Sequence, residues 1–274
     1  MDNYQNKTIW VTGASSGIGE ALAREFSQAG GNVILSGRRV DALTRVADTL
    51  PNDTLVLPFE VTDYESLEDI VEQAWAWKGR VDVLVNNAGV SQRSLAIETK
   101  PQVYADLINI DLVAPIWLTQ LQLARMVEAG GAHIVAISSV AGRLGAPLRT
   151  AYSAAKHGLI GYMDALRSEV SLQHNIQVTN VLPGSVATAV SINALTADGS
   201  KRGRSDAQID GGDSPADCAA AIVAAVSANV PELIYAQGSE LALAKLRQTD
   251  PLKLFELTAE FGKTVAEKYE IDSP

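Results

Sequence analysis

The clearest candidates for chemistry are a tyrosine and a lysine four residues apart, Tyr152 and Lys156, in the run Tyr-Ser-Ala-Ala-Lys. Residues at this spacing share one face of a helix, so both side chains can reach the same pocket. A nearby ammonium stabilises a phenolate relative to a phenol, which makes Tyr152 a usable general acid or base near neutral pH. Ser139 ends the strand expected before this helix. Because a Tyr and a Lys at this spacing are also common on helix surfaces, the pair alone does not identify a catalytic site.

A second chemical signal is the glycine-rich turn at 12–19, Thr-Gly-Ala-Ser-Ser-Gly-Ile-Gly, between the first expected strand and its helix. Glycines let the backbone turn sharply and approach a pyrophosphate, whose charge is met by free N–H groups and the positive end of the helix. The spacing differs from the more common fingerprint Gly-x-Gly-x-x-Gly. The turn predicts a dinucleotide site, and a tight turn without a ligand is the alternative.

The end of the second expected strand indicates which dinucleotide binds. A site for NAD places an Asp or Glu on the ribose 2′-hydroxyl there, but this chain has Gly37-Arg38-Arg39. Guanidinium groups bind phosphate through paired, charge-assisted hydrogen bonds, whereas a carboxylate would repel it. Ser15 could add a hydroxyl contact. We therefore expect NADP(H) rather than NAD(H), with solvated surface arginines as the alternative.

The elements that must position these residues are short apolar strands, each followed by a helix. Such an alternation is typical of a parallel sheet covered on both faces, so we expect one doubly wound α/β domain. Strands are expected at 7–12, 32–36, 54–57, 81–85, 133–138, 176–182 and 232–235. Helices are expected at 17–29, 40–49, 64–77, 101–129, 151–173 and 215–228.

Two later segments depart from this alternation. The segment 185–213 is rich in Gly, Ser, Asp and Arg and has no long apolar period, so we expect a substrate lid, with a disordered connection as the alternative. The segment 239–274 holds two further expected helices that form a C-terminal extension. Their apolar residues could close the active site, pack on a second subunit or pack on the domain's own core.

Composition excludes several classes of function. The chain has 22 Lys and Arg against 32 Asp and Glu, a net charge of −10, which opposes binding to nucleic acid or to an anionic membrane. Its apolar stretches fall short of the roughly 20 residues that span a bilayer, and its start does not resemble a signal peptide. The single cysteine, Cys218, fits a reducing compartment, so we expect a cytoplasmic location. The three histidines lack metal-ligand spacing, and we expect no metal.

Five motifs occur together: Thr-Gly-x-x-x-Gly-x-Gly at 12–19, Asn-Asn-Ala-Gly at 86–89, Ser139, Tyr-x-x-x-Lys at 152–156 and Pro-Gly at 183–184. In this order and spacing the chain resembles a short-chain dehydrogenase/reductase. The resemblance implies a single Rossmann-type domain over 1–274, with a seven-stranded, mainly parallel sheet. It also implies that Tyr152 gives or takes a proton, Ser139 hydrogen-bonds the substrate oxygen and Lys156 binds the nicotinamide ribose.

The same resemblance assigns the rest of the cofactor site. Residues 87–89 would flank the cofactor, Val186 and Thr188 would hold the nicotinamide carboxamide, and Glu60-Val61 would lie beside the adenine, where the family commonly has Asp-Val. The full expected set is Gly13, Ser15, Ser16, Gly17, Ile18, Gly19, Arg38, Arg39, Glu60, Val61, Asn87, Ala88, Gly89, Tyr152, Lys156, Pro183, Gly184, Val186 and Thr188.

One residue departs from the family pattern at the chemistry. Asp111 stands where the family commonly has an Asn, which holds a water that links the lysine to solvent. An ionised Asp accepts hydrogen bonds but donates none. We expect Asp111 to approach Lys156 through that water, to neutralise it in part and to raise the pH optimum for oxidation. The alternative is a locally bonded Asp beside a kink at Pro115, and Asn109 would point to a different helix face.

Within the family, the chain resembles the branch of dehydrogenase/reductase member 7, whose members act on hydrophobic carbonyls. We expect an NADP(H)-dependent oxidoreductase for a carbonyl or secondary alcohol, forming a homodimer or homotetramer through its fifth and sixth helices. A basic cluster in the lid, Lys201, Arg202 and Arg204, could meet an anionic substrate or be solvated. A non-catalytic NADP(H)-binding sensor is the alternative function.

Overall fold

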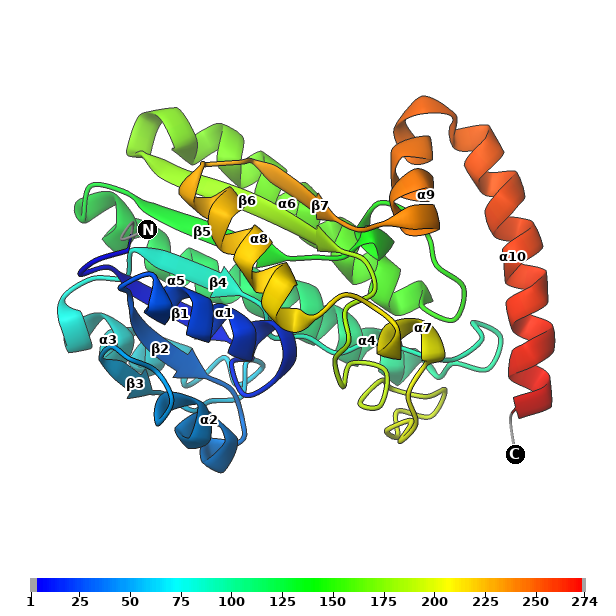
Figure 1. Ribbon diagram of the computed structural model, residues 1–274, viewed down its shortest axis with the longest axis horizontal. Helices are drawn as coiled ribbons and strands as arrows, with labels where there is room; N and C mark the ends of the chain where they lie inside the picture. The colour runs from blue at the N-terminus through cyan, green and yellow to red at the C-terminus, as the bar shows by residue number, and fades with distance from the viewer. Residues whose placement is uncertain (1–3, 273–274) are drawn as a thin grey trace.

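The computed structural model describes residues 4–272 and has a seven-stranded sheet at its centre (Figure 1). The strand order is β3-β2-β1-β4-β5-β6-β7, and every neighbouring pair is parallel, so the expected mainly parallel sheet is parallel throughout. The strands are β1 (Thr8–Thr12), β2 (Asn32–Ser36), β3 (Thr54–Val56), β4 (Val83–Asn86), β5 (Ala132–Ile137), β6 (Ile176–Pro183) and β7 (Glu232–Tyr235).

Helices cover both faces of this sheet, and alternate residues of each strand point to opposite helical layers. The helices of the two layers are α1 (Gly17–Gln28), α2 (Val40–Ala47) and α8 (Pro215–Ser227) on one face, and α3 (Leu67–Lys78), α5 (Ala114–Glu128) and α6 (Thr150–His174) on the other. In β1, Ile9 and Val11 pack with α1, α2 and α8, whereas Trp10 packs with α3, α5 and α6. This arrangement confirms the doubly wound fold.

Part of the apolar surface of the fifth and sixth helices, through which subunits are expected to pair, packs in this core. Leu118 of α5 and Leu159 and Leu166 of α6 are at most 4% exposed and pack beneath the sheet, because the apolar stripe that faces the strands includes them. The large apolar side chains exposed on α5 are Trp117 and Val127, at 45% and 39%. Pairing of subunits through α5 and α6 stays a prediction.

The single helix expected at 101–129 is interrupted by a π-helical turn. It consists of α4 (Pro101–Ile108), the turn η1 (Asn109–Val113) and α5. Pro115 has no N–H to donate to the carbonyl of Asp111, and the N–H of Ala114 donates instead to Asn109, five residues back. The wider turn leaves Asp111 fully buried. Contrary to the expectation that every apolar stretch is too short, the helical run 101–128 is, among the described residues, long and apolar enough to cross a membrane, and 33% of its most apolar 18 residues is buried.

The expected lid, 185–213, is held by side-chain and backbone contacts along its length. It contains the short helix α7 (Ala207–Asp210) and isolated bridges that pair Val186 with Asp213 and Gln92 with Leu195. Arg93, which follows β4 and is 5% exposed, donates from Nε to Asp206 Oδ2 at 2.6 Å. Arg202 of the expected basic cluster also pairs with Asp206. The lid is therefore tied to the loop after β4.

The C-terminal extension forms two packed helices, α9 (Gly238–Thr249) and α10 (Pro251–Asp272), at one end of the sheet (Figure 1). Ala244 and Leu254 are buried, so part of the extension's apolar surface packs within the domain. Leu252, Phe255 and Phe261 are 73%, 52% and 54% exposed. A role for this exposed face in pairing with a second subunit stays a prediction, and residues 273–274 lie outside the described part.

Candidate active site

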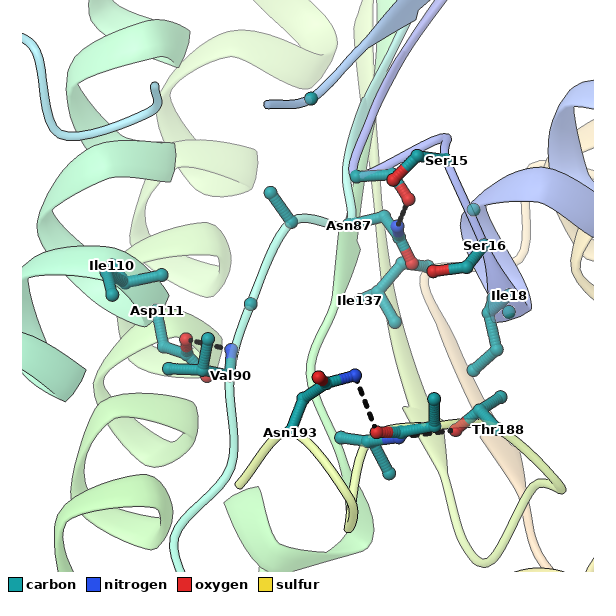
Figure 2. A pocket seen from close by; sticks show the side chains of 18 of the residues that line it. Ser15, Ser16, Ile18, Asn87, Val90, Ile110, Asp111, Ile137, Thr188 and Asn193 are labelled. Carbon is teal, nitrogen blue, oxygen red and sulfur yellow. Dashed lines mark hydrogen bonds between the residues drawn. The ribbon is translucent and has the colours of Figure 1, made fainter. Parts of the chain in front are cut away.

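A cavity of about 450 Å³ lies at the carboxyl ends of the parallel strands. This is where open α/β sheets bind ligands. All of the residues expected to bind cofactor line it, and so do Ser139 and Asp111. Figure 2 shows Asp111 and Val90 on one side of the cavity and Ser15 and Ser16 of the glycine turn on the other. The structure thus brings the predicted residues together, while their individual roles stay predictions.

Of the other lining residues, Lys201 was singled out from the sequence as part of the lid's basic cluster, and the rest belong to no motif. Some are direct neighbours of predicted residues, and the rest are mainly apolar side chains from the strand ends and the lid. Adjacency to a motif is the one signal that could have found the first group. The additional lining residues are Gly37, Phe59, Val90, Ile110, Ile137, Ser138, Ala189, Val190, Asn193, Leu195, Lys201 and Ile209.

The glycine turn is a surface made of backbone. Gly13 and Gly17 have φ of +67° and +61°, which side chains disfavour. A Cβ on Gly19 would lie 2.3 Å from the carbonyl oxygen of Gly13 and 2.4 Å from Asn87 Nδ2. The helix α1 begins directly after Ser16, so its first N–H groups face this turn. Glycine at 13 and 19 therefore lets the turn, the start of α1 and the end of β4 pack closely together beside the cavity.

The turn is joined to the end of β4 by a small polar network. Thr12 Oγ1 accepts hydrogen bonds from the backbone N–H groups of Asn87 and Ala88, at 3.0 and 3.1 Å. Asn87 Nδ2 donates to the carbonyl oxygen of Thr12 at 2.8 Å. These bonds hold two predicted cofactor-binding segments, which are distant in the sequence, at a constant separation.

Two arginines border the cavity beyond the glycine turn. Arg39 donates to Ser15 Oγ at 3.0 Å and to Ser16 Oγ at 2.9 Å. Arg38 pairs with Glu60 at 3.4 Å, and these side chains are 65% and 40% exposed. Exposed pairs of this kind contribute little free energy, so an incoming anionic group can replace them. Both guanidinium groups are therefore available to a phosphate.

Tyr152, Lys156 and Ser139 meet where α6 crosses the end of β5. Lys156 Nζ lies 5.6 Å from the ring centroid of Tyr152 and donates to the carbonyl oxygen of Ile137 at 3.0 Å. Ser139 begins the 3-10 turn η2 (Val140–Gly142), where its Oγ accepts from Ala141 N at 3.1 Å and donates to Pro183 O at 3.3 Å. All three residues line the same cavity.

Asp111 contacts Lys156 directly, which corrects the expected water-mediated approach. Asp111 Oδ2 lies 3.3 Å from Lys156 Nζ, and Oδ1 accepts from Val90 N at 2.9 Å (Figure 2). The contact is direct because the π turn η1 carries the carboxylate fully into the interior. Asn109 points elsewhere and accepts a hydrogen bond from the Tyr64 hydroxyl at 2.5 Å, as its position on another face predicted.

The two charges of this pair change each other's titration. Burial raises the pKa of the Asp111 carboxyl, although the charge of Lys156 and the Val90 hydrogen bond oppose this change. Burial acts to lower the pKa of Lys156, but the charges of Asp111 and Tyr152 outweigh it, so the Lys156 pKa is raised overall. Lys156 therefore keeps its ammonium form to a higher pH than a free lysine would, because Asp111 lies beside it.

Comparison with known proteins identifies the family. The sequence profile described as short chain dehydrogenase matches residues 7–198. The chain belongs to the short-chain dehydrogenase family. As a short-chain dehydrogenase it is an oxidoreductase that uses NAD(P)(H), and the family and fold predictions are confirmed.

Curated relatives extend the match beyond the profile. A "Dehydrogenase/reductase SDR family protein 7-like" protein from Anopheles gambiae is 38% identical over 261 residues, covering 92% of this chain and 82% of its own length. "Dehydrogenase/reductase SDR family member 7" from Homo sapiens is 33% identical over 268 residues, covering 95% and 79%. The predicted likeness to the member 7 branch is thus confirmed.

Solved structures agree with this fold. A short-chain dehydrogenase from Streptomyces avermitilis superposes with a TM-score of 0.78 at 32% identity, covering 96% of this chain and 98% of the other. One from Burkholderia phymatum, in complex with NAD, has a TM-score of 0.81 at 22% identity, covering 91% and 95%. At that identity the second likeness bears on the fold alone. Within residues 4–272, no cluster of three or more His, Cys, Asp or Glu side chains could hold a metal.

Proposed function

We propose that this short-chain dehydrogenase uses NADP(H) and interconverts a carbonyl compound and a secondary alcohol, with Tyr152 as the general acid and base. The observation that carries the proposal is the meeting of Tyr152, Lys156 and Ser139 in the same cavity as the glycine turn. A proton-transferring group, its electrostatic support and a second hydroxyl thus border one site.

The cofactor fits the groups present. At Gly13 and Gly19 the turn packs too closely on α1 and the end of β4 to admit a Cβ, so a backbone surface at the start of α1 faces the cavity, as a pyrophosphate site requires. Arg38 and Arg39 supply two cations where a 2′-phosphate would lie, and the nearby carboxylate of Glu60 already pairs with Arg38. These features favour NADP(H) over NAD(H) in this chain.

When bound, the nicotinamide supplies or accepts the hydride. In reduction, the Tyr152 hydroxyl gives its proton to the substrate oxygen as the carbonyl carbon becomes an alcohol carbon; in oxidation it takes that proton back. Ser139 exchanges its long 3.3 Å bond to Pro183 O for a bond to the substrate oxygen. The Lys156 ammonium stabilises the phenolate that remains on Tyr152 after reduction.

We propose that Asp111 weakens the stabilisation of the Tyr152 phenolate by the Lys156 ammonium. Its carboxylate lies 3.3 Å from Lys156 Nζ, so the pair presents less positive charge to Tyr152 than the ammonium alone. The pair therefore gives less electrostatic support than a lone ammonium would to negative charge on the nearby Tyr152 oxygen.

The cavity also supports a substrate class. Its lining outside the cofactor segments is largely apolar, with Val90, Ile110, Val190 and Leu195 among its walls, which suits a hydrophobic carbonyl compound. Of the lid's basic cluster, Lys201 lines the cavity, whereas Arg202 pairs with Asp206. We further propose a cytoplasmic homodimer or homotetramer that acts without nucleic acid or membrane.

The test is turnover of NADPH and of NADH with a panel of hydrophobic ketones and aldehydes. We expect oxidation of NADPH, coupled to formation of alcohol, with at least one member of the panel and at lower NADPH than NADH concentration. Tight NADPH binding without turnover of any carbonyl or alcohol would instead favour the non-catalytic sensor. Equal use of NADH would contradict the proposed cofactor preference.

A further inference from the structure

Glu240 is a charged residue of the C-terminal extension that contacts the lid rather than the cavity. It lies in the first turn of α9 and is partly buried. Its Oε2 accepts a hydrogen bond from Ser185 N at 2.8 Å, and its Oε1 accepts from Ser185 Oγ at 2.8 Å and from Gln208 Nε2 at 2.9 Å. One carboxylate therefore bonds to both the start of the lid and the helix α7 near its end.

This carboxylate also lies close to Gly184, the glycine of the Pro-Gly motif. Gly184 does not have a positive φ, so its conformation does not require glycine. A Cβ at position 184 would instead lie 2.3 Å from Glu240 Oε2 and 3.0 Å from the Cβ of Ala236. The contact between α9 and the lid thus occupies the space that a side chain at 184 would need.

A second contact from the same end of α9 holds the other end of the lid. Gln237 Nε2 donates to Asp213 Oδ1 at 3.0 Å. Asp213 is bonded to the lid's start, since its N–H donates to Ser185 O at 3.1 Å and its carbonyl oxygen accepts from Ala187 N at 2.9 Å. The two ends of the lid are therefore joined to each other and to the first residues of α9.

The partners of Glu240 are sequence neighbours of residues that line the cavity. Ser185 stands between Gly184 and Val186, and Gln208 precedes Ile209; these three neighbours all line the cavity. A carboxylate that accepts three hydrogen bonds holds such segments more firmly than neutral groups would. Movement of Glu240 would therefore be passed to both the expected carboxamide segment and the far wall of the cavity.

We propose that Glu240 is a positioning residue for the reaction: from α9 it holds the lid's two ends in the geometry that binds cofactor and substrate. The proposal rests on the proposed function for its kinetic consequences. The proposal gives the C-terminal extension a role at the site without any contact to substrate. It also implies that a molecule that packs on α9 or α10 would change the geometry of the lid.

The test compares Glu240→Gln and Glu240→Ala with the wild type, with Glu267→Gln on exposed α10 as the matched control. The measurements are the NADPH dissociation constant, KM and kcat for a reactive carbonyl, and the rate of tryptic cleavage in the lid. We expect Glu240→Ala to raise the dissociation constant and KM roughly tenfold, since charged hydrogen bonds are lost, and to change kcat less. Lid cleavage should be faster, and the control should match the wild type.

Glu240→Gln separates positioning from folding, because the amide has the same shape but only one acceptor oxygen. It can accept from Ser185 N or from Gln208, but not from both, so we expect effects between those of wild type and Glu240→Ala. If Glu240→Ala does not fold, the measurements are made on Glu240→Gln alone. A lower active fraction with unchanged KM and NADPH affinity would indicate a merely structural role and would overturn the proposal.

The two proposals fail in different ways. If no carbonyl or alcohol is turned over, the proposed function fails, while NADPH affinity and lid cleavage still test Glu240. If both variants keep wild-type NADPH affinity, lid cleavage and KM, the role of Glu240 is wrong, whatever the activity of the wild type.

Discussion

At the cofactor end of the cavity, the binding surface is backbone, whereas at the lid end it is held by side-chain contacts between distant segments. Gly13 and Gly19 leave no room for a Cβ. At the other end, Arg93 meets Asp206 and Glu240 meets Ser185, pairs that are 113 and 55 residues apart. One end therefore depends on the absence of side chains and the other on their presence.

This difference decides how each end responds to substitution. A backbone surface tolerates no side chain, since an added Cβ meets carbonyl oxygens and amide nitrogens that cannot move aside. A surface held by hydrogen-bonded side chains can lose one contact and keep the others, so its changes are graded. The predictions that follow test this contrast, from the largest expected effect to the smallest.

Gly19→Val should have the largest effect. Its Cβ would lie 2.3 Å from Gly13 O, so we expect loss of NADPH binding and a free energy of unfolding lower by about 3 kcal/mol or more. The matched control is Gly161→Ala on α6, where a Cβ meets nothing within 4 Å. The control should bind NADPH normally and be equally or more stable, because alanine favours helix. Chemical denaturation measures the free energy of unfolding of both variants, and NADPH titration measures their cofactor affinity. Normal NADPH binding by Gly19→Val would contradict the proposed role of the glycine turn.

Arg38→Asp should change cofactor preference without loss of folding. The substitution removes a cation and adds an anion at the expected 2′-phosphate, so we expect the ratio of NADPH to NADH efficiency to fall at least about tenfold. Arg45→Asp, an exposed change on α2 outside the cavity, is the control and should keep the ratio. The measurement is kcat/KM for each cofactor. An unchanged ratio of NADPH to NADH efficiency in Arg38→Asp would contradict the proposed role of Arg38 in binding the 2′-phosphate.

Asp111→Asn should have the smallest effect, a displacement of the pH–rate profile for oxidation. Asp111 keeps the Lys156 pKa raised; without it, burial lowers that pKa, and the ammonium is lost at a lower pH. The limb of the profile that reports loss of the Lys156 ammonium should therefore move toward acid by about one pH unit. Asp69→Asn on α3 is the exposed control. Superimposable profiles for wild type and Asp111→Asn would exclude this role.

The same contrast explains what could be predicted from the sequence. The turn at 12–19 was recognisable because only glycine satisfies its φ angles and close approaches, and the strands because buried parallel strands are continuously apolar. The direct Asp111–Lys156 contact was not, because it depends on the π turn that Pro115 imposes. The contacts of Glu240 could not be predicted from the sequence either, because no local pattern distinguishes a glutamate that accepts hydrogen bonds from Ser185 from one that is solvated.

The central claim is proton transfer by Tyr152 in an NADP(H)-dependent reaction, and the most direct measurement is single-turnover oxidation of bound NADPH by a carbonyl substrate in wild type and Tyr152→Phe. Loss of the hydroxyl leaves the ring and the contacts of Lys156 in place, so NADPH affinity should be unchanged. We predict a rate lower by about 10²- to 10⁴-fold in Tyr152→Phe. A rate equal to that of the wild type, at equal NADPH affinity, would contradict the account.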